Sequence, residues 1–251
     1  MAITSRSATT RSALSRPAIL TVAFGLGLAY LAVQGLAHSE EPVKRVPSAT
    51  VDESVADAPG TEKLVLAGGC FWGVQGVFQH VRGVSRAVSG YAGGSSATAH
   101  YEVVGSGLTG HAESVEITYD PKQVTLGSLL QIFFSVAHDP TELNRQGPDS
   151  GSQYRSAVFP ADEAQKRVID AYIAQLGAAH VYQGPIVTKT DLLRGFFPAE
   201  RYHQDYLTLN PTQPYIAYND IPKVQNLKRL FPDRYRDAPV LVTVASAAAA
   251  R

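Results

Sequence analysis

The chain has 251 residues, one cysteine, and 22 basic residues balanced by 22 acidic ones. A single cysteine excludes an intramolecular disulfide and a cysteine-rich zinc or iron–sulfur site, and zero net charge gives no indication of nucleic-acid binding. A hydrophobic content of 45% with 18% charged residues is typical of a globular protein with a sizeable core.

The N-terminal segment has the pattern of an export signal. Residues 1–17 contain three arginines and no acidic residue, and residues 18–37 form an apolar run without a charge. Small residues, Gly35 and Ala37, stand at the spacing of a signal-peptide cleavage site, but the run is also long enough to remain as a membrane anchor. A buried core helix is disfavoured by the arginine-rich flank. We therefore expect an exported protein that is periplasmic, secreted or anchored in the membrane.

Two further segments are expected to lie outside the fold. Residues 38–60 are polar, contain prolines and show no periodicity, which predicts a flexible linker. Residues 237–251, ending in ASAAAAR, are expected to form a disordered tail. One domain remains, residues 61–236, and because nothing in it indicates a dimer interface we expect a monomer.

Within this domain, apolar spacing predicts strands and helices that alternate with long coil segments. This order favours an α+β fold, a two-layer sandwich or roll with a mixed sheet, over a doubly wound parallel sheet. The glycine-rich turn after the first strand lacks the nucleotide-binding patterns. In chain order the expected elements are strand 63–67, helix 71–81, strand 84–91, strand 114–120, helix 125–137, strand 155–159, helix 162–176, strand 186–190 and helix 199–209.

Cys70 follows two glycines and opens the first expected helix. Free backbone N–H groups and the positive end of the helix dipole favour a thiolate there, and a thiolate is the nucleophilic form of cysteine. Phe71 and Trp72 follow and would form an aromatic wall suited to an uncharged substrate group. The alternative is that Cys70 is a small buried hydrophobic residue, as most lone cysteines are.

Three more side chains are candidates for acid or hydrogen-bond chemistry. Glu113 could remain protonated in an apolar pocket and serve as a general acid, and Tyr101 and Tyr154 could polarise an oxygen through their hydroxyl groups. Each also has an ordinary interpretation, as a solvated charge at a strand end or as a core tyrosine with a bonded hydroxyl.

Taken together, these motifs make the chain similar to the peptide methionine sulfoxide reductases of the A type. The resemblance covers about residues 63–215, and its most specific part is the G-C-F-W-G sequence. The motifs that carry it are, in order, Gly69-Cys-Phe-Trp-Gly73, Gly90-Tyr-Ala-Gly-Gly94, Gly110-His-Ala-Glu113, Tyr119-Asp-Pro121, His138-Asp-Pro140, Gln153-Tyr-Arg-Ser156, Tyr202-His-Gln-Asp-Tyr206 and Asn210-Pro211.

The resemblance implies a role for each candidate in reducing methionine S-sulfoxide, free or within a peptide, so that oxidised proteins are repaired. Cys70 matches the nucleophile that attacks the sulfoxide sulfur and becomes a sulfenic acid. Glu113 matches the acid that protonates the sulfoxide oxygen. Tyr101 and Tyr154 match the two hydroxyls that bind this oxygen, and Asp149 matches an assisting acid.

The resemblance also implies a substrate pocket and a mode of recycling. Phe71 and Trp72 match the pocket for the substrate methyl group, and no metal or cofactor is implied. Many relatives carry resolving cysteines near the C-terminus, whereas residues 211–251 contain none. An external thiol must then reduce Cys70: a thioredoxin-like protein, or glutathione with glutaredoxin.

The residues alone suggest three alternatives, of which the zinc site falls for want of its partner motif. A cysteine hydrolase would need His111, His138 or His203 to activate Cys70, but the local patterns of papain-like and caspase enzymes are absent. A zinc site at His111-x-Glu113 lacks its P-C-x-x-C partner. A non-enzymatic module could instead capture methionine side chains in the aromatic pocket.

Overall fold

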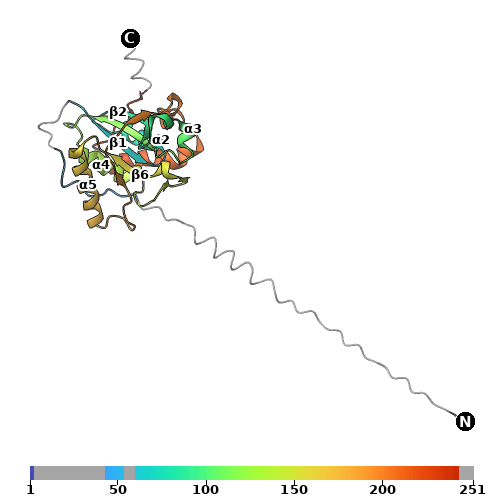
Figure 1. Ribbon diagram of the computed structural model, residues 1–251. Helices are drawn as coiled ribbons and strands as arrows, with labels where there is room; N and C mark the ends of the chain where they lie inside the picture. The colour runs from blue at the N-terminus through green and yellow to red at the C-terminus, as the bar shows by residue number, and fades with distance from the viewer. Residues whose placement is uncertain (3–42, 54–59, 243–251) are drawn as a thin grey trace. The chain divides into compact units, whose positions relative to one another are not determined.

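Figure 1 shows the protein in a computed structural model, which describes residues 1–2, 43–53 and 60–242. The chain divides into two units, residues 1–39 and 40–251, and the sheet and helices belong to the second unit. Within the described ranges, no helix is long and apolar enough to cross a bilayer. The apolar run 18–37 lies outside those ranges.

A six-stranded mixed sheet forms one layer of the domain, with strand order β7-β6-β1-β3-β2-β8. All neighbouring strands are antiparallel except β6 and β7, which are parallel. The strands are β1 (Glu62–Gly68), β2 (Val84–Ala92), β3 (Ala112–Tyr119), β6 (Ser156–Phe159), β7 (Lys189–Thr190) and β8 (Phe196–Pro198), with a separate hairpin of β4 (Arg145–Gln146) and β5 (Asp149–Ser150).

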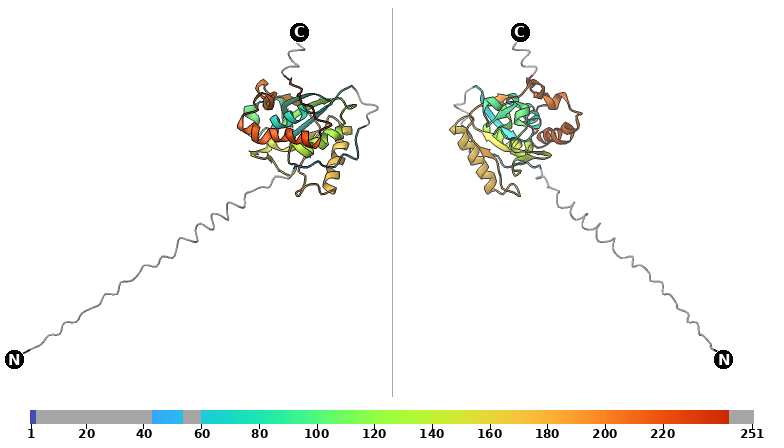
Figure 2. Two further views of the ribbon diagram at one scale, coloured as in Figure 1. Left: turned by 180° about the vertical axis from the view of Figure 1, so that it is seen from behind. Right: turned by 45° about the vertical axis from the view of Figure 1, so that its right-hand side comes forward.

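Helices cover one face of this sheet, and α5 and α7 lie on opposite sides of the domain (Figure 2). Helix α2 packs against strand β2 and against α7. The helical segments are α2 (Phe71–Gln79), α3 (Tyr101–Val104), α4 (Leu126–Ile132), α5 (Glu163–Ala178), α6 (Tyr206–Leu209) and α7 (Ile221–Leu230), the 3-10 turns η2 (Ser96–Thr98), η4 (Ser152–Tyr154) and η5 (Arg201–His203), and the π-helical turns η3 (Phe133–Ala137) and η6 (Ile216–Asp220).

Alternation along the strands separates a large core from a small one. In β1, Leu64 and Leu66 face the main core beneath the helices, whereas Val65 and Ala67 belong to a smaller cluster on the other face, which coil covers. The same alternation places Glu113, at the start of β3, on the helix-covered side of the sheet. A carboxyl group is thus carried into the apolar layer that also contains Cys70.

The α+β fold with a mixed sheet is confirmed, and several expected elements differ in extent. The helix expected over 125–137 is an α-helix, Leu126–Ile132, followed by a π-helical turn, Phe133–Ala137. The strand expected over 186–190 shrinks to two residues, and the helix over 199–209 is two short turns. Helix α7 was not predicted.

The flexible linker expected over 38–60 is wrong for residues 43–53, which bind to the domain. Val46 is buried, its N–H donates to Ser135 Oγ (3.1 Å), and its carbonyl accepts from Gln131 Nε2 (2.7 Å). The Asp52 carboxylate accepts from a backbone N–H in the first turn of α4 (2.9 Å). The polar composition of residues 43–53 suggested a linker, but their side chains and carbonyl groups form hydrogen bonds with α4 and α5.

The disordered tail expected over 237–251 is wrong for residues 237–242. Val240 N–H donates to the carbonyl of Gln79 (3.0 Å), and Val242 N–H donates to Asp205 Oδ1 (3.0 Å). The end of α2 leaves a carbonyl available, and this segment satisfies it.

Candidate active site

Cys70 stands between the end of β1 and the start of α2. Gly69 has a φ of +87°, and a Cβ at this position would lie 2.5 Å from the Gln146 side chain. Glycine is required here because both the backbone conformation and the close approach exclude a side chain. The turn fixes the sulfur at the N-terminus of α2, where the side chain is 8% exposed.

The free N–H groups of α2 bind two acidic groups. Phe71 N–H donates to Glu113 Oε2 (3.1 Å), and Trp72 N–H donates to the sulfur of Cys70. The helix terminus therefore holds the candidate nucleophile and the candidate acid side by side.

Burial keeps both groups protonated at neutral pH in the substrate-free protein. Burial is the largest cause that raises the pKa of Glu113 to about 8; the Phe71 N–H opposes it, and the charges of Asp149 and Asp220 add to it. Burial also raises the pKa of the Cys70 thiol well above its usual range. Burial therefore opposes the thiolate that the helix N-terminus favours.

Tyr101 and Tyr154 share this electrostatic environment. Burial raises the pKa of Tyr101 to about 12, and the charges of Glu113 and Cys70 raise it further. Burial, Glu113 and Asp149 likewise raise the pKa of Tyr154. Both phenols therefore remain neutral hydrogen-bond donors at physiological pH.

Of the two aromatic residues after Cys70, Phe71 is buried and Trp72 is partly accessible. Phe71 is 1% exposed, and its ring centroid lies 5.0 Å from that of His203. Trp72 is partly buried and stacks on Tyr206 with centroids 3.9 Å apart, while its Nε1–H donates to His203 Nδ1 (3.1 Å). The side chains of the Tyr202–Tyr206 motif thus fix the indole ring.

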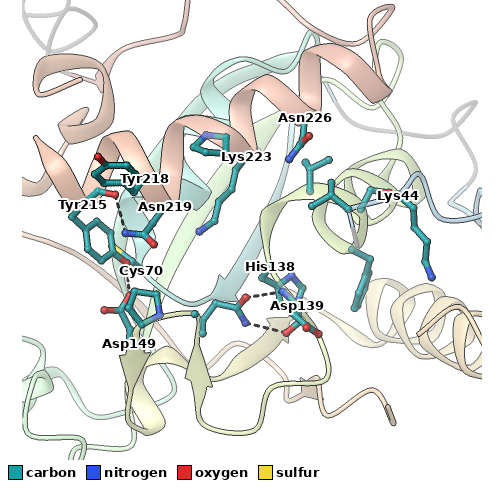
Figure 3. A pocket seen from close by; sticks show the side chains of 18 of the residues that line it. Lys44, Cys70, His138, Asp139, Asp149, Tyr215, Tyr218, Asn219, Lys223 and Asn226 are labelled. Atoms are coloured by element: carbon teal, nitrogen blue, oxygen red, sulfur yellow. Dashed lines mark hydrogen bonds between the residues drawn. The ribbon is translucent and has the colours of Figure 1, made fainter. Parts of the chain in front are cut away.

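A cavity of about 250 Å³ opens beside Cys70, on the side of the β4–β5 hairpin and α7 (Figure 3). Asp149 lines it and accepts a hydrogen bond from the hydroxyl of Tyr215. Lys223 extends into it from α7 and contacts Asp220 Oδ1 (3.2 Å). None of Glu113, Tyr101 and Tyr154 belongs to its lining.

The structure thus gathers Cys70, Glu113, Tyr101 and Tyr154 into one electrostatic cluster and places Asp149 at its border with the cavity. The sequence alone indicated no role in sulfoxide reduction for a second set of residues around Cys70, of which only His203 was a candidate, as the base of a hydrolase. A signal was available for Lys223 on α7, since Pro222 near the first turn of this helix and apolar spacing along it are typical of a helix. This second set comprises His203, Tyr206, Tyr215, Asp220 and Lys223.

The histidines that a hydrolase would use are bound elsewhere. His138 contacts Ser156 Oγ (2.7 Å), and burial lowers its pKa to about 3. The ring of His111 contacts the Ser95 carbonyl (2.9 Å), and His203 accepts from Trp72. Among residues 43–53 and 60–242, no group of three or more His, Cys, Asp or Glu side chains could hold a metal ion.

Comparison with known proteins gives one consistent family. The family model for peptide methionine sulfoxide reductase matches residues 62–235. The chain is 65% identical over 189 residues to peptide methionine sulfoxide reductase MsrA 2 of Mesorhizobium japonicum, covering 75% of this chain and 97% of that protein. It is 48% identical over 195 residues to the MsrA 2 of a Synechocystis species, covering 77% and 91%.

Solved structures agree with these relatives. Reduced Mxr1 from Saccharomyces cerevisiae is 31% identical with a TM-score of 0.56, covering 68% of this chain and 94% of that one. Methionine sulfoxide reductase A of Corynebacterium diphtheriae is 34% identical with a TM-score of 0.52, covering 68% and 86%. On these matches and the G-C-F-W-G turn, the chain belongs to the peptide methionine sulfoxide reductases of the A type.

Proposed function

We propose that this protein reduces methionine S-sulfoxide, free or peptide-bound, to methionine through a sulfenic acid on Cys70. Its family is that of the thiol-dependent methionine sulfoxide reductases, which are oxidoreductases that repair oxidised proteins. The observation that carries the proposal is the pairing of Cys70 with a buried Glu113 at the N-terminus of α2. Preference for the S epimer rests on the family resemblance.

In the first half-reaction, the sulfur of Cys70 attacks the sulfoxide sulfur while Glu113 donates a proton to the sulfoxide oxygen. Without this proton the oxygen would leave as a strongly basic oxide. The protonated oxygen then moves from the substrate sulfur to the Cys70 sulfur as the S–S bond formed in the attack breaks, methionine departs, and the Glu113 carboxylate accepts the thiol proton. The balance is one thiol and one sulfoxide consumed, and one sulfenic acid and one thioether formed.

The surrounding side chains would stabilise this step and orient the substrate. Tyr101 and Tyr154 donate hydrogen bonds to the oxygen as charge develops on it, which supports an oxyanion-binding role. Trp72 offers an apolar surface for the substrate methyl group, with Phe71 packed behind it. Asp149 assists as a second acid near Glu113.

The second half-reaction would use an external thiol, since Cys70 is the only cysteine of the chain. A first thiol displaces the sulfenic oxygen as water and forms a mixed disulfide with Cys70. A second thiol then releases Cys70 and leaves as the disulfide. The reductant is a thioredoxin-like protein, or glutathione with glutaredoxin, and the protein itself requires no metal or organic cofactor.

We also propose that the protein works outside the cytoplasm as a monomer. The arginine-rich flank and the apolar run 18–37 support export. Sequencing the N-terminus of the mature protein distinguishes a cleaved signal, with a terminus near His38, from an anchor. Full-length protein in the soluble cytosol would contradict export, and a sedimentation mass of two chains would contradict the monomer.

One assay tests the activity and separates it from its alternatives. Native protein, Cys70→Ser and Glu113→Gln are incubated with methionine S-sulfoxide and dithiothreitol, and methionine is quantified. We expect methionine from native protein, none from Cys70→Ser, and one sulfenic acid per chain after a turnover without reductant. A methionine-binding module would bind equally well after Cys70→Ser and consume no thiol, and a hydrolase would leave the sulfoxide intact.

A further inference from the structure

We infer that Glu200 is a positioning residue for Tyr101, one of the two phenols that would bind the sulfoxide oxygen. This inference rests on the proposed function and gives a role in it to the segment between strand β8 and turn η5. The Glu200 carboxylate accepts two hydrogen bonds, one from the backbone N–H of Tyr101 (3.0 Å) and one from the hydroxyl of Tyr91 (2.8 Å). A single side chain therefore joins the first residue of α3 to strand β2.

The sheet places Glu200 beside these two groups. Strand β8 pairs with β2 so that Phe197 lies opposite Tyr91, and the N–H of Ala199 donates to the carbonyl of Ser89 (2.9 Å). Glu200 follows directly, at the edge of the sheet, and its side chain is partly buried. Because backbone pairing sets the place of Glu200, its carboxylate is a fixed point to which α3 is attached.

Tyr101 needs such a point of attachment because its hydroxyl does not hold the side chain in place. Within residues 43–53 and 60–242 this hydroxyl makes no hydrogen bond, and α3 has only 4 residues. The direction of the phenol is therefore set by the backbone of Tyr101 and by the packing of its ring. An unbonded hydroxyl can donate to the oxygen of a substrate, but it does so efficiently only if the ring is held in the right position.

Glu200 also holds the ring against which Tyr101 packs. The rings of Tyr101 and His203 lie with their centroids 4.3 Å apart. The backbone N–H of His203 donates to the carbonyl of Glu200 (2.9 Å), and the His203 ring accepts from Trp72 Nε1–H (3.1 Å). Glu200 thus binds the backbone of Tyr101 through its side chain and the backbone of His203 through its main chain.

The negative charge of Glu200 strengthens the contact with Tyr101. Partial burial raises the pKa of Glu200, but the N–H of Tyr101 and the other hydrogen bonds to the carboxylate outweigh burial and leave this pKa below its usual value. The side chain is therefore ionised at neutral pH, and hydrogen bonds to a carboxylate are roughly twice as strong as those between neutral groups. Glu102, the next residue in α3, is exposed, and among the described residues its carboxylate makes no hydrogen bond or ion pair. It provides a matched control.

Displacement of Tyr101 should lower the rate of the chemical step rather than weaken substrate binding, because its hydroxyl would act on charge that develops during the reaction. Glu200→Ala should reduce single-turnover methionine formation about tenfold at saturating methionine sulfoxide, with little change in the half-saturating concentration. Glu200→Gln should keep most of the rate, since its amide can accept from Tyr101 N–H and donate to the Tyr91 oxygen. Glu102→Ala should behave like the native protein.

A double-mutant cycle with Tyr101→Phe tests whether Glu200 acts through Tyr101. In the Tyr101→Phe background, Glu200→Ala should cost less than about twofold, because the hydroxyl that Glu200 positions is already absent. Tyr91→Phe is a second variant, which removes the other partner of the carboxylate, and it should show the same dependence on Tyr101. Alkylation of Cys70 by iodoacetamide should keep its native rate in Glu200→Ala, as expected if the rest of the site is intact.

Three results would overturn the inference. The first is a full loss from Glu200→Ala in the Tyr101→Phe background, and the second is equal rates for Glu200→Ala and Glu102→Ala. The third is a change in Cys70 alkylation as large as the change in methionine formation, because that result describes a general loosening of the site. Absence of methionine formation by the native protein would instead reject the proposed function.

Discussion

Two groups of side chains around Cys70 differ in the charge that they carry. On one side Glu113, Tyr101 and Tyr154 are held in forms that burial keeps neutral and proton-bearing. On the other side the wall of the cavity carries charges of both signs, Lys44 and Lys223 together with Asp139 and Asp149. The difference indicates that the first group can give a proton and hydrogen bonds to the sulfoxide oxygen, whereas the wall of the cavity is polar and mixed in charge.

Glu113→Gln should produce the largest effect on the proton-donating side. The amide keeps the shape of the side chain but cannot donate a proton of comparable acidity, so we expect methionine formation to fall about 10²- to 10⁴-fold. Single-turnover measurement of methionine isolates this step. Glu116→Gln is the matched control, because Glu116 is on the same strand but faces the other way and pairs with Lys63. An equal loss in both variants would contradict the role of Glu113.

Tyr101→Phe and Tyr154→Phe should follow in size. Each removes one donor to the developing oxyanion, and we expect about a 10²-fold loss in single-turnover rate for each variant. Tyr202→Phe is the control, since that side chain is 60% exposed. If recycling by dithiothreitol fell as much as methionine formation did, the separation of the two sides would be wrong.

The pKa of Glu113, about 8, predicts the pH dependence of the first half-reaction. The protonated form is the active one, so the single-turnover rate should fall about tenfold per pH unit above pH 8. Glu113→Gln should lack this decrease. A native rate that rises steadily through pH 8 to 9 would show that thiol ionisation, rather than the carboxyl group, controls the step.

The same carboxyl group should make the fold less stable at high pH. Its folded pKa lies above the unfolded value, so the native state binds more protons between pH 4.5 and about 8 and stability falls as pH rises through this window. The loss is at most a few kcal/mol. Denaturant unfolding of native protein and Glu113→Gln at pH 5 and pH 8.5 measures it, and only the native protein should lose this increment.

The sequence predicted the proton-donating side well because its residues belong to regular elements. The period of β3 carries Glu113 into the core, and the Gly68–Gly69 turn places Cys70 at a helix N-terminus. The protonation state of Cys70 was not predictable, because it depends on how completely the packed chain excludes water from the sulfur.

The cavity side was harder to predict because distant segments build it. Residues 43–44, the β4–β5 hairpin and α7 meet there, and no local pattern reports their contact. The segment 43–53 has the composition of a linker, yet Val46 is buried and bonded. Local periodicity therefore describes elements, whereas cavities between elements depend on pairings that are remote in the chain.

The smallest expected effects come from two helical glycines, one packed against the buried Asp220 and one in open space. A Cβ at Gly73 in α2 would lie 2.2 Å from Asp220 Oδ1, whereas one at Gly177 in α5 would meet nothing within 4 Å. Gly73→Ala should cost about 1–3 kcal/mol by overpacking, and Gly177→Ala should gain about 0.5–1 kcal/mol through reduced chain entropy. Denaturant unfolding measures both. Because the Cβ of Gly73→Ala would displace the Asp220 carboxylate, a change in unfolding free energy equal to that of Gly177→Ala would contradict the close packing of α2 against Asp220.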